Sequence, residues 1–434
     1  MIWSAFKTFR DVGVFGSEIT NDALRSAVGI EAPAAFDFLS SLVSRPSRCG
    51  EELAAQQLIE LTLAELGFEV RRVPIAASIV DDELAGVPAA PYEGRFNVLG
   101  TTPHDGKRTL LLNGHIDVVP VNPSTWKSDP FVPVVRDGWM YGRGAGDMKG
   151  GYAMAVLALR ALRRVGSSVG RRNLSFLSVI EEECTGNGTL SALRAGVSAD
   201  AVVLPEPTNL RILLGGVAIT WVKVTINFGG GHAESSDRLA SPAQTVARLI
   251  ERLGQLEAAY NKDPRAPFDS IAHPYNVNVG VIKLGEWPSS VPASAELEVR
   301  VGHPDEVSDS QVVTDVREVV ADVLASAGGL GFDVVMHGFR AEGYHLAADH
   351  PLVRMVAAAH DAMHTTLPLT EVLGSTTDAR YYVNQAGVPA LCFGPVVENM
   401  HGSNERVNLE SIEVGSATLA RFLLDYFDQE GEGS

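Results

Sequence analysis

Two kinds of strand pattern divide this chain, and together they limit the folds it can adopt. Short runs such as 109–114 and 173–180 are almost wholly apolar, and helical patterns such as 150–166 lie between them. A strand that is apolar on both sides has to be covered on both sides, which is typical of a mixed or parallel sheet between layers of helices. We therefore predict an α/β domain with a mixed, mostly parallel sheet, formed by residues 1–216 and 341–434.

The middle of the chain follows the second pattern. Apolar and polar residues alternate in three stretches, at 221–228, 275–285 and 295–302. Such alternation predicts an antiparallel sheet with one face exposed to solvent. Amphipathic helical patterns accompany it at 241–260 and 310–329. Because 434 residues are too many for one ordinary core, we expect an inserted α+β domain over residues 217–340.

The composition and the cysteines exclude several classes of protein. The formal net charge is −18 and no basic segment stands out, which argues against a nucleic-acid binder. The N-terminal stretch 1–16 lacks the long apolar core of a signal peptide, and no apolar run approaches the ~18 residues that a membrane helix needs. Cys49, Cys184 and Cys392 are far apart in the sequence, so neither a disulfide framework nor a cysteine zinc site is expected. We expect a cytoplasmic protein with no membrane partner.

Side chains that can bind metal recur where predicted strands end. They are His115 and Asp117, Asp147, Glu181 to Glu183, Glu206, and Glu398, His401 and Glu405. The carboxyl ends of strands meet at one edge of an α/β sheet, so these distant segments can converge there. Each residue alone has an ordinary explanation, such as a helix cap for Asp147 or a turn residue for Asp117. One metal site explains all five strand ends at once, which the ordinary explanations do not.

The donor chemistry indicates which kind of metal site this would be. Imidazole and carboxylate ligands suit Zn²⁺, Co²⁺ or Mn²⁺, and two histidines with several carboxylates suit two such ions sharing a carboxylate bridge. Two ions about 3.5–4 Å apart can polarise a carbonyl and generate a metal-bound hydroxide. Such a centre also needs a carboxylate that binds no metal and takes the proton of the water.

Seven motifs follow one another along nearly the whole chain: NGHIDVVP, YGRGAGDMKGG, EEECTGNG, PEPT, GGGHA, STTDAR and GPVVENMHGSNE. As an ordered set they resemble the co-catalytic zinc amidohydrolase family of acetylornithine deacetylase, succinyl-diaminopimelate desuccinylase, aminoacylase and carboxypeptidase G. The resemblance implies a dinuclear-zinc exopeptidase-like catalytic domain. It also implies that the inserted domain is a lid, which makes the contact of a homodimer.

The resemblance also assigns the candidate ligands. It implies two metals held by His115 and Glu206, by Glu183 and His401, and by Asp147 as the bridge. Asp117 would be the partner of the second ring nitrogen of His115. The peptide bond between Asp147 and Met148 would be cis.

The run Glu181–Glu182–Glu183 can be aligned in two ways. The family usually has Asp-Glu-Glu followed by a glycine several residues later. With Gly188 as that glycine, Glu182 is the general base and Glu183 the ligand, and Glu181 stands where the family has an aspartate. Strand alternation instead places Glu181 and Glu183 on one face. That leaves a second register open, with Glu181 as base and Glu182 as ligand.

Residues of both domains are expected to hold the substrate. His232, in GGGHA, matches a histidine that reaches the substrate carbonyl in this family, often from the partner subunit, where it would stabilise the oxyanion. Arg300 matches an arginine that binds the substrate's carboxylate in this family. Upstream, Ser289 stands where the family often has an asparagine, which weakens the expectation that the substrate is held in the same way. Without the resemblance, the sequence favours His232 as an ordinary turn residue. Arg300 is as well explained as an exposed strand residue as it is by contact with the substrate. Further substrate contacts are expected from Thr377, Asp378, Arg380 and Gly394, and Asp378 could equally be structural.

These residues predict hydrolysis of the amide bond of an N-acyl amino acid or related small N-acyl compound. Glu182 would take the proton of the attacking water and deliver it to the leaving amine. A dipeptidase or carboxypeptidase with the same centre remains an alternative, since its chemistry is identical. A non-catalytic metal-binding relative is disfavoured by the intact base and ligands. A phosphoesterase with two metals is disfavoured because the sequence has no phosphate loop or arginine cluster.

Overall fold

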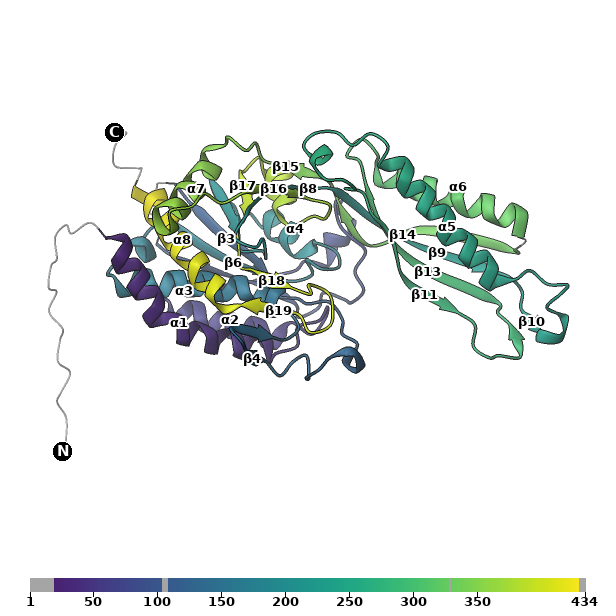
Figure 1. Cartoon of the computed structure of the whole chain (residues 1–434), viewed down its shortest axis with the longest axis horizontal. Coiled ribbons are helices and arrows are strands. Elements are labelled where there is room, and N and C mark those ends of the chain that lie inside the picture. Colours follow the sequence, from purple (N-terminus) through teal and green to yellow (C-terminus); the bar gives the residue numbers. More distant parts are fainter. Residues whose placement is uncertain (1–18, 104–107, 328, 429–434) are drawn as a thin grey trace, which may run out of the picture.

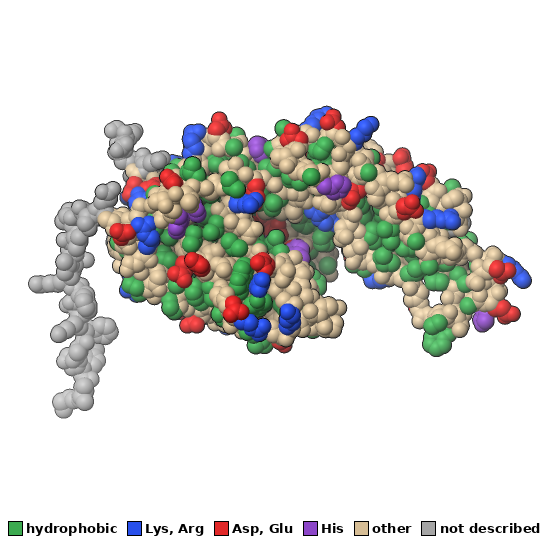
Figure 2. Space-filling model, viewed as in Figure 1, with side chains coloured by type: hydrophobic (Ala, Val, Ile, Leu, Met, Phe, Trp, Pro, Cys, Tyr) green, Lys and Arg blue, Asp and Glu red, His purple; other side chains and the backbone are tan. Residues whose placement is uncertain are grey.

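The computed structural model describes residues 19–103, 108–327 and 329–428, which form two lobes of unequal size (Figure 1). The stretch 1–16, on which the expectation about a signal peptide depends, lies outside these residues. The lobes join along one side and leave an open notch between them on the other (Figure 2).

The larger lobe is built on a nine-stranded mixed sheet, in the order β1-β2-β6-β3-β7-β17-β8-β15 with β16 beside β8. Its strands are β1 (Glu69–Pro74), β2 (Phe96–Thr101), β3 (Leu110–His115), β6 (Leu174–Val179), β7 (Ala201–Leu204), β8 (Ile212–Gly216), β15 (Tyr344–His345), β16 (Thr370–Leu373) and β17 (Ala390–Cys392). The central strands β6, β3, β7 and β17 run parallel, and antiparallel pairs flank them. The predicted mixed, mostly parallel sheet is confirmed.

Helices cover both faces of this sheet. One face carries α1 (Asn21–Val43), α2 (Leu53–Glu65), α3 (Gly150–Arg164), α7 (Pro351–His364) and α8 (Leu409–Asp428), and the other carries α4 (Asn187–Arg194) and the π-turn Tyr381–Ala386. Along β3, Leu110 and Leu112 pack into the first core and Leu111 packs into the second. Each such side chain contributes about 1.5–3 kcal/mol on burial, which explains why both sides of the strand are apolar.

Helix α1 corrects one expectation from the sequence. By length and composition alone it could cross a membrane. Four charged residues interrupt its apolar pattern, which is why no continuous run stood out. In the structure its apolar residues, among them Leu24, Leu39 and Leu42, instead pack in the core against α3 and α8.

The smaller lobe has a four-stranded antiparallel sheet in the order β11-β13-β9-β14. Its elements are β9 (Ala218–Asn227), α5 (Pro242–Tyr260), β11 (Val277–Leu284), β13 (Ser294–His303), α6 (Asp309–Ala327), β14 (Gly331–Ala341) and the ribbon β10 (Gly231–His232) with β12 (Ser290–Val291). Buried residues of β9, such as Val222 and Val224, pack with α5 and α6. The opposite face of the sheet, which includes Trp221 and Arg300, faces the larger lobe. Strand β14 was not predicted, because a register shift between Met336 and Arg340 breaks its alternation.

A third, small sheet positions part of the site. It comprises β4 (Val134–Arg136), β5 (Trp139–Tyr141), β18 (Val397–Glu398) and β19 (Arg406–Asn408), in the order β18-β19-β5-β4. Because β18 and β19 are paired, the turn between them, residues 399–405, is held beside the segment that follows β5. These strands are too short to give a recognisable pattern in the sequence.

Candidate metal centre

Asp147 lies between two imidazole rings that come from opposite ends of the chain. Its Oδ1 is 3.1 Å from Nε2 of His115, and its Oδ2 is 3.2 Å from Nε2 of His401. Each carboxylate oxygen therefore faces a different histidine. This is the arrangement expected of a carboxylate that bridges two cations.

Each histidine also has a carboxylate of its own. Oε2 of Glu206 is 3.8 Å from His115 Nε2, and Oε1 of Glu183 is 3.1 Å from His401 Nε2. The potential ligand atoms of His115, Asp147 and Glu206 all lie within 4.8 Å of one another, and so do those of Asp147, Glu183 and His401. The structure thus brings together all five predicted ligands in two groups that share Asp147.

The loop that carries Asp147 is held by a buried glutamate. Asp147 lies in a π-turn (Ala145–Lys149), and the predicted cis peptide bond to Met148 is present. Glu405 accepts hydrogen bonds from the backbone N–H groups of Gly144, Gly146 and Asp147, at 3.1, 2.8 and 2.9 Å. Its side chain also forms an ion pair with Arg143.

Glu405 was a candidate ligand in the sequence, but its position shows a different role. It contacts the backbone of the ligand loop and belongs to neither ligand group. Glu398, the other glutamate near His401, pairs with Arg406 and is half exposed. Nothing in the sequence distinguishes a buried supporting carboxylate from a ligand, because both follow a short strand.

The geometry of the glutamate run separates its three members. Glu183 lies beside His401, and both Glu182 and Glu183 line the cavity described below. Glu181 is fully buried elsewhere and accepts hydrogen bonds from Tyr92 (2.6 Å), Arg95 and Thr185 (2.7 Å). This arrangement favours the register with Glu182 as base and Glu183 as ligand.

The strand-alternation argument fails here for a physical reason. Strand β6 ends at Val179, and Glu181 has a left-handed backbone with φ of 64°. The strand therefore ends before the run, so side chains no longer alternate between two faces. Gly188 is needed where the turn that follows the strand enters α4, because a Cβ there would lie 2.0 Å from the carbonyl oxygen of Ile180.

Asp117 connects the two halves of the centre. Its carboxylate accepts hydrogen bonds from the backbone N–H groups of Glu182 (3.1 Å) and Glu183 (3.0 Å). Nδ1 of His115 is 3.0 Å from the backbone carbonyl of Asp117 and 3.7 Å from its carboxylate. The predicted partner of His115 is thus present, but the closer contact is to the main chain, and the carboxylate holds the glutamate turn.

The electrostatics of the centre fit divalent cations. Glu183 raises the pKa of His401 to about 11, against the opposing effect of burial. Although burial lowers the pKa of His115, Glu206 and Asp147 raise it well above its usual range. Burial raises the pKa of Glu182 well above its usual range and that of Glu206 to about 8. These carboxylates attract positive charge strongly, and imidazole and carboxylate donors without thiolate are a suitable ligand set for zinc-like ions.

A cavity of about 550 Å³ extends from the metal centre to the smaller lobe. His115, Asp147 and Glu182 line one end, and Trp221, Arg300 and Phe339 of the smaller lobe line the other. Arg300 donates to the backbone carbonyls of Asn276 (3.4 Å) and Gly374 (3.3 Å). Among the residues that the structure describes, no carboxylate forms an ion pair with Arg300. Its guanidinium is available to an anionic group in the cavity.

The other predicted substrate contacts divide into two groups. Thr377 lines the cavity. Asp378 and Arg380 are each 2% exposed. They pack against each other, and the guanidinium lies over the rings of Phe339 and Tyr381. Gly394 packs closely against the segment that carries Glu206, since a Cβ at Gly394 would lie 2.0 Å from the carbonyl oxygen of Glu206. Of the described residues that line the cavity, none is Asp378, Arg380 or Gly394, so these three support its wall.

His232 lies away from the metal centre in this chain. It belongs to β10, at the outer tip of the smaller lobe (Figure 1). The residue is exposed, and its Nδ1 accepts a hydrogen bond from the backbone N–H of Glu234 at 3.2 Å. Within one chain, the structure does not bring His232 together with the predicted ligands.

Comparison with curated proteins gives relatives of nearly full length. The chain is 31% identical to a succinyl-diaminopimelate desuccinylase of Cereibacter sphaeroides over 401 residues, which cover 89% of this chain and 97% of the relative. It is 28% identical over 369 residues to an N-formyl-4-amino-5-aminomethyl-2-methylpyrimidine deformylase of Bacillus subtilis, covering 79% of this chain and 85% of the relative.

Solved structures show the same fold, and a family model matches most of the chain. Human carnosine dipeptidase 1 matches with a TM-score of 0.76 at 17% identity, covering 93% of this chain and 99% of that chain. The dipeptidase Dug1p of Saccharomyces cerevisiae matches with a TM-score of 0.79 at 14% identity, covering 96% and 100%. The model of peptidase family M20/M25/M40 matches residues 111–425. The chain therefore belongs to peptidase family M20/M25/M40 and is a metallohydrolase of that family, as the ordered motifs predicted.

Proposed function

We propose that this protein hydrolyses the amide bond of an N-acyl amino acid or a related small N-acyl compound. One observation carries the proposal: the two oxygens of Asp147 each face an imidazole, and Glu182 lines the same cavity. The two most similar relatives reported above bear names that describe removal of a formyl or succinyl group from an amine-containing compound. Their names support a deacylase.

The two ligand groups would hold two divalent cations, and we propose zinc as the resident metal. His115, Glu206 and Asp147 would hold one ion, and Glu183, His401 and Asp147 the other. When bound, such ions polarise the amide carbonyl and make water more acidic. No cysteine belongs to either group, so cobalt or manganese could replace zinc in the same ligand set.

Glu182 is the residue that would move the proton. It is 8% exposed, and burial raises its pKa well above the usual range of a carboxyl group. A carboxylate with a raised pKa accepts a proton from the attacking water more readily and can return it to the leaving amine. The carboxylate of Asp117 accepts a hydrogen bond from the backbone N–H of Glu182 and would thereby act as a positioning residue.

Arg300 and Thr377 would bind the substrate beyond the reacting bond. The guanidinium can form a bidentate pair with a carboxylate of the amino-acid half. Trp221 and Phe339 form an apolar part of the cavity wall near the guanidinium of Arg300. This combination favours a substrate that carries both an anionic group and an apolar part.

His232 would reach the oxyanion from a second copy of the chain. In one chain it lies at the tip of the smaller lobe, so it can act at a metal centre only if another molecule brings it there. We therefore propose a homodimer formed through the smaller lobes. Its oxyanion contact would be a hydrogen bond from the imidazole.

A dipeptidase or carboxypeptidase is the second candidate. The solved structures of similar fold include dipeptidases, but at 14–17% identity they show the fold alone. The metal centre would perform the same chemistry on a peptide bond. The difference would lie in the cavity wall.

The test is a substrate panel with the metal content measured. Wild-type protein is loaded with zinc and assayed on N-acetyl, N-formyl, N-succinyl and N-carbamoyl amino acids and on dipeptides. We expect two equivalents of metal and a preference for one class of N-acyl compound. Hydrolysis of dipeptides only would favour the second candidate. A protein that binds no divalent metal, and that no added metal activates, would contradict both.

A further inference from the structure

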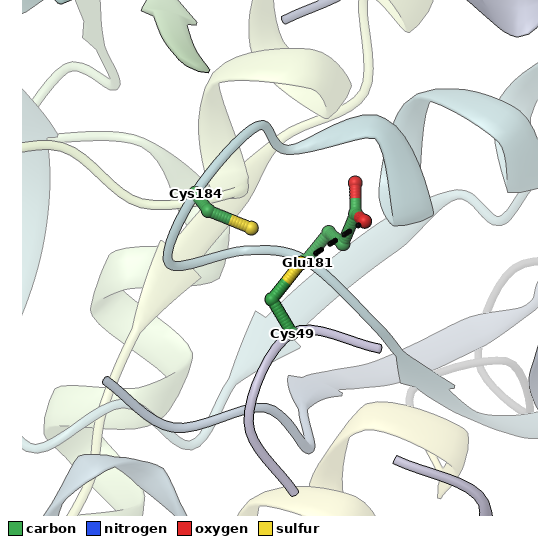
Figure 3. Close-up of side chains that lie close together, drawn as sticks. All are labelled: Cys49, Glu181 and Cys184. Atoms are coloured by element: carbon green, nitrogen blue, oxygen red, sulfur yellow. Dashed lines mark hydrogen bonds between the residues drawn. The ribbon is translucent and has the colours of Figure 1, made fainter. Parts of the chain in front are cut away.

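Two of the three cysteines, distant in the sequence, meet beside the glutamate turn. Cys49 lies in the turn between α1 and α2, and Cys184 directly follows Glu183. The two sulfur atoms and a carboxylate oxygen of Glu181 all lie within 4.8 Å of one another. In Figure 3 the sulfur of Cys184 points toward Cys49 and Glu181. Both cysteines are free thiols and partly accessible to solvent.

This cluster has the composition of a metal site, but its surroundings oppose a cation. The carboxylate of Glu181 already accepts hydrogen bonds from Tyr92, Arg95 and Thr185. The guanidinium of Arg95 pairs with Glu181 and has its Nη2 3.9 Å from the sulfur of Cys49. The same guanidinium also pairs with Glu52, and the Cys49 thiol donates a hydrogen bond to Glu181 at 3.5 Å (Figure 3). The oxygens of Glu181 are thus taken by protein donors rather than free for a metal ion, and Nη2 of Arg95 can stabilise a thiolate at Cys49.

We propose that Cys49 and Cys184 form a reversible disulfide that links oxidation to the position of the metal ligands. A hydroperoxide is the oxidant. The thiolate of Cys49 attacks a peroxide oxygen, the O–O bond breaks, and protonation of the leaving group gives water or an alcohol with Cys49 as the sulfenic acid. The Cys184 thiolate then attacks that sulfur and displaces hydroxide, which is protonated to water. The two thiols lose two electrons, and a dithiol reverses the reaction by exchange.

Both sulfurs belong to segments that carry or support the ligands. The hydroxyl of Ser47, two residues before Cys49, donates to the carbonyl of Ile116 at 2.6 Å, next to His115. The backbone N–H of Val118 donates to the carbonyl of Ser47 at 3.0 Å. On the other side, Glu183 immediately precedes Cys184 and is held by Asp117. The disulfide would therefore tie together the segments that carry His115 and Glu183.

Closing the bond requires movement of these segments. A disulfide needs an S–S distance of about 2.05 Å, whereas the sulfurs are separated by up to 4.8 Å. Side-chain rotation supplies part of the approach, and displacement of the Glu182–Glu183 turn supplies the rest. Because misplacing a catalytic group by about 1 Å can cost up to about 100-fold in rate, we expect the oxidised protein to be at least about tenfold less active.

The experiment compares zinc-loaded wild type with Cys49→Ser, Cys184→Ser and Cys392→Ser. Each protein is treated with hydrogen peroxide, alkylated, digested and analysed by mass spectrometry, and bound zinc and amidase activity are measured before and after dithiothreitol. Cys392 is fully buried and serves as the control. We expect a Cys49–Cys184 peptide pair in wild type and Cys392→Ser, with loss of zinc or activity that is restored by dithiothreitol, its removal and reloading with zinc. Cys49→Ser should keep its bound zinc and its activity after the same treatment.

Three results would overturn the proposal. The first is oxidised wild type without the Cys49–Cys184 peptide pair. The second is the pair present with zinc content and activity unchanged. The third is a further equivalent of zinc that Cys49→Ser removes, which would identify a cation site. The effects on activity and on zinc content rest on the proposed function, but the peptide pair does not, so failure of either proposal can be recognised separately.

Discussion

The two lobes hold their functional residues in different ways. In the larger lobe, buried groups fix the ligands and their loops: Asp117 holds the glutamate turn and Glu405 holds the loop of Asp147. In the smaller lobe, the guanidinium of Arg300 donates to two main-chain carbonyls, and His232 is exposed. We propose that the larger lobe carries out the reaction, whereas the smaller lobe contributes the contact that selects an anionic substrate.

The largest effect is expected from replacing two neighbouring glutamates of the larger lobe, one at a time, by glutamine. Glu182→Gln removes the group that moves the proton, and we expect kcat to fall by about 10²–10⁴-fold with metal content unchanged. Glu181→Gln is the matched control. It weakens a buried ion pair with Arg95, so the melting temperature should fall while kcat of the folded protein is retained. The opposite pattern of kcat values would show that the register is wrong by one residue.

A second test removes a support of the metal ligands and leaves the ligands intact. Glu405→Gln weakens the hydrogen bonds to the Asp147 loop and the pair with Arg143, and we expect zinc affinity to fall about 10–100-fold. Competition with a chelator of known affinity measures this change. Glu398→Gln changes an exposed residue at the end of β18 that is paired with Arg406, and it should leave the affinity unaltered. Equal losses in both variants would mean that Glu405 has no special part in holding the loop.

The smaller lobe is tested through the guanidinium of Arg300. Arg300→Ala should raise KM by about 10–100-fold for substrates with a free carboxylate, since a hydrogen bond to a charged group contributes about 1.5–3 kcal/mol. Amidated forms of the same substrates provide the control and should show little change. If kcat falls instead and KM is unaffected, Arg300 acts on the reaction itself, and the division between the lobes does not hold.

Per pH unit, the dependence of metal binding on pH is the smallest expected effect. Glu183 raises the pKa of His401 to about 11, so below that pH the metal-free imidazole carries a proton that a metal must displace. Raising the pH removes this competition, and zinc affinity should increase by up to about tenfold per pH unit for each proton released. Titration calorimetry between pH 6 and 8, in buffers with different ionisation enthalpies, counts the protons. Binding with no proton release would contradict the electrostatic description of the centre.

Local patterns in the sequence predicted the fold class and a wider set of candidate ligands, and the resemblance to a known family selected five of them. Apolar strands predict a covered sheet, and strands that end at one edge bring His115, Glu183 and Glu206 together. The register of the glutamate run required more than a pattern, because the left-handed residue Glu181 ends the alternation of the strand. In the sequence, the register of this run was indicated only by Gly188, the glycine of the motif.

Other features depend on contacts between distant segments, which no local pattern shows. The role of Glu405 follows from three backbone N–H groups more than 250 positions away in the chain. The meeting of Cys49 with Cys184 is of the same kind. Asp378 and Arg380 were expected near the substrate because their motif lies there, but adjacent Thr377 reaches the cavity while they pack behind it.

The pairing of β9 with β14 has a consequence for how such proteins diversify. The chain enters the smaller lobe at Ala218 and leaves it at Ala341, and Ile219 is paired with Ala341 across the two strands. Just inside the larger lobe, Gly216 is paired with Tyr344. The whole insertion therefore begins and ends at one place, and a cut at these two points separates it without crossing the central sheet. Exchange of this segment between relatives by recombination could transfer a substrate preference as a single cassette onto an unaltered metal centre.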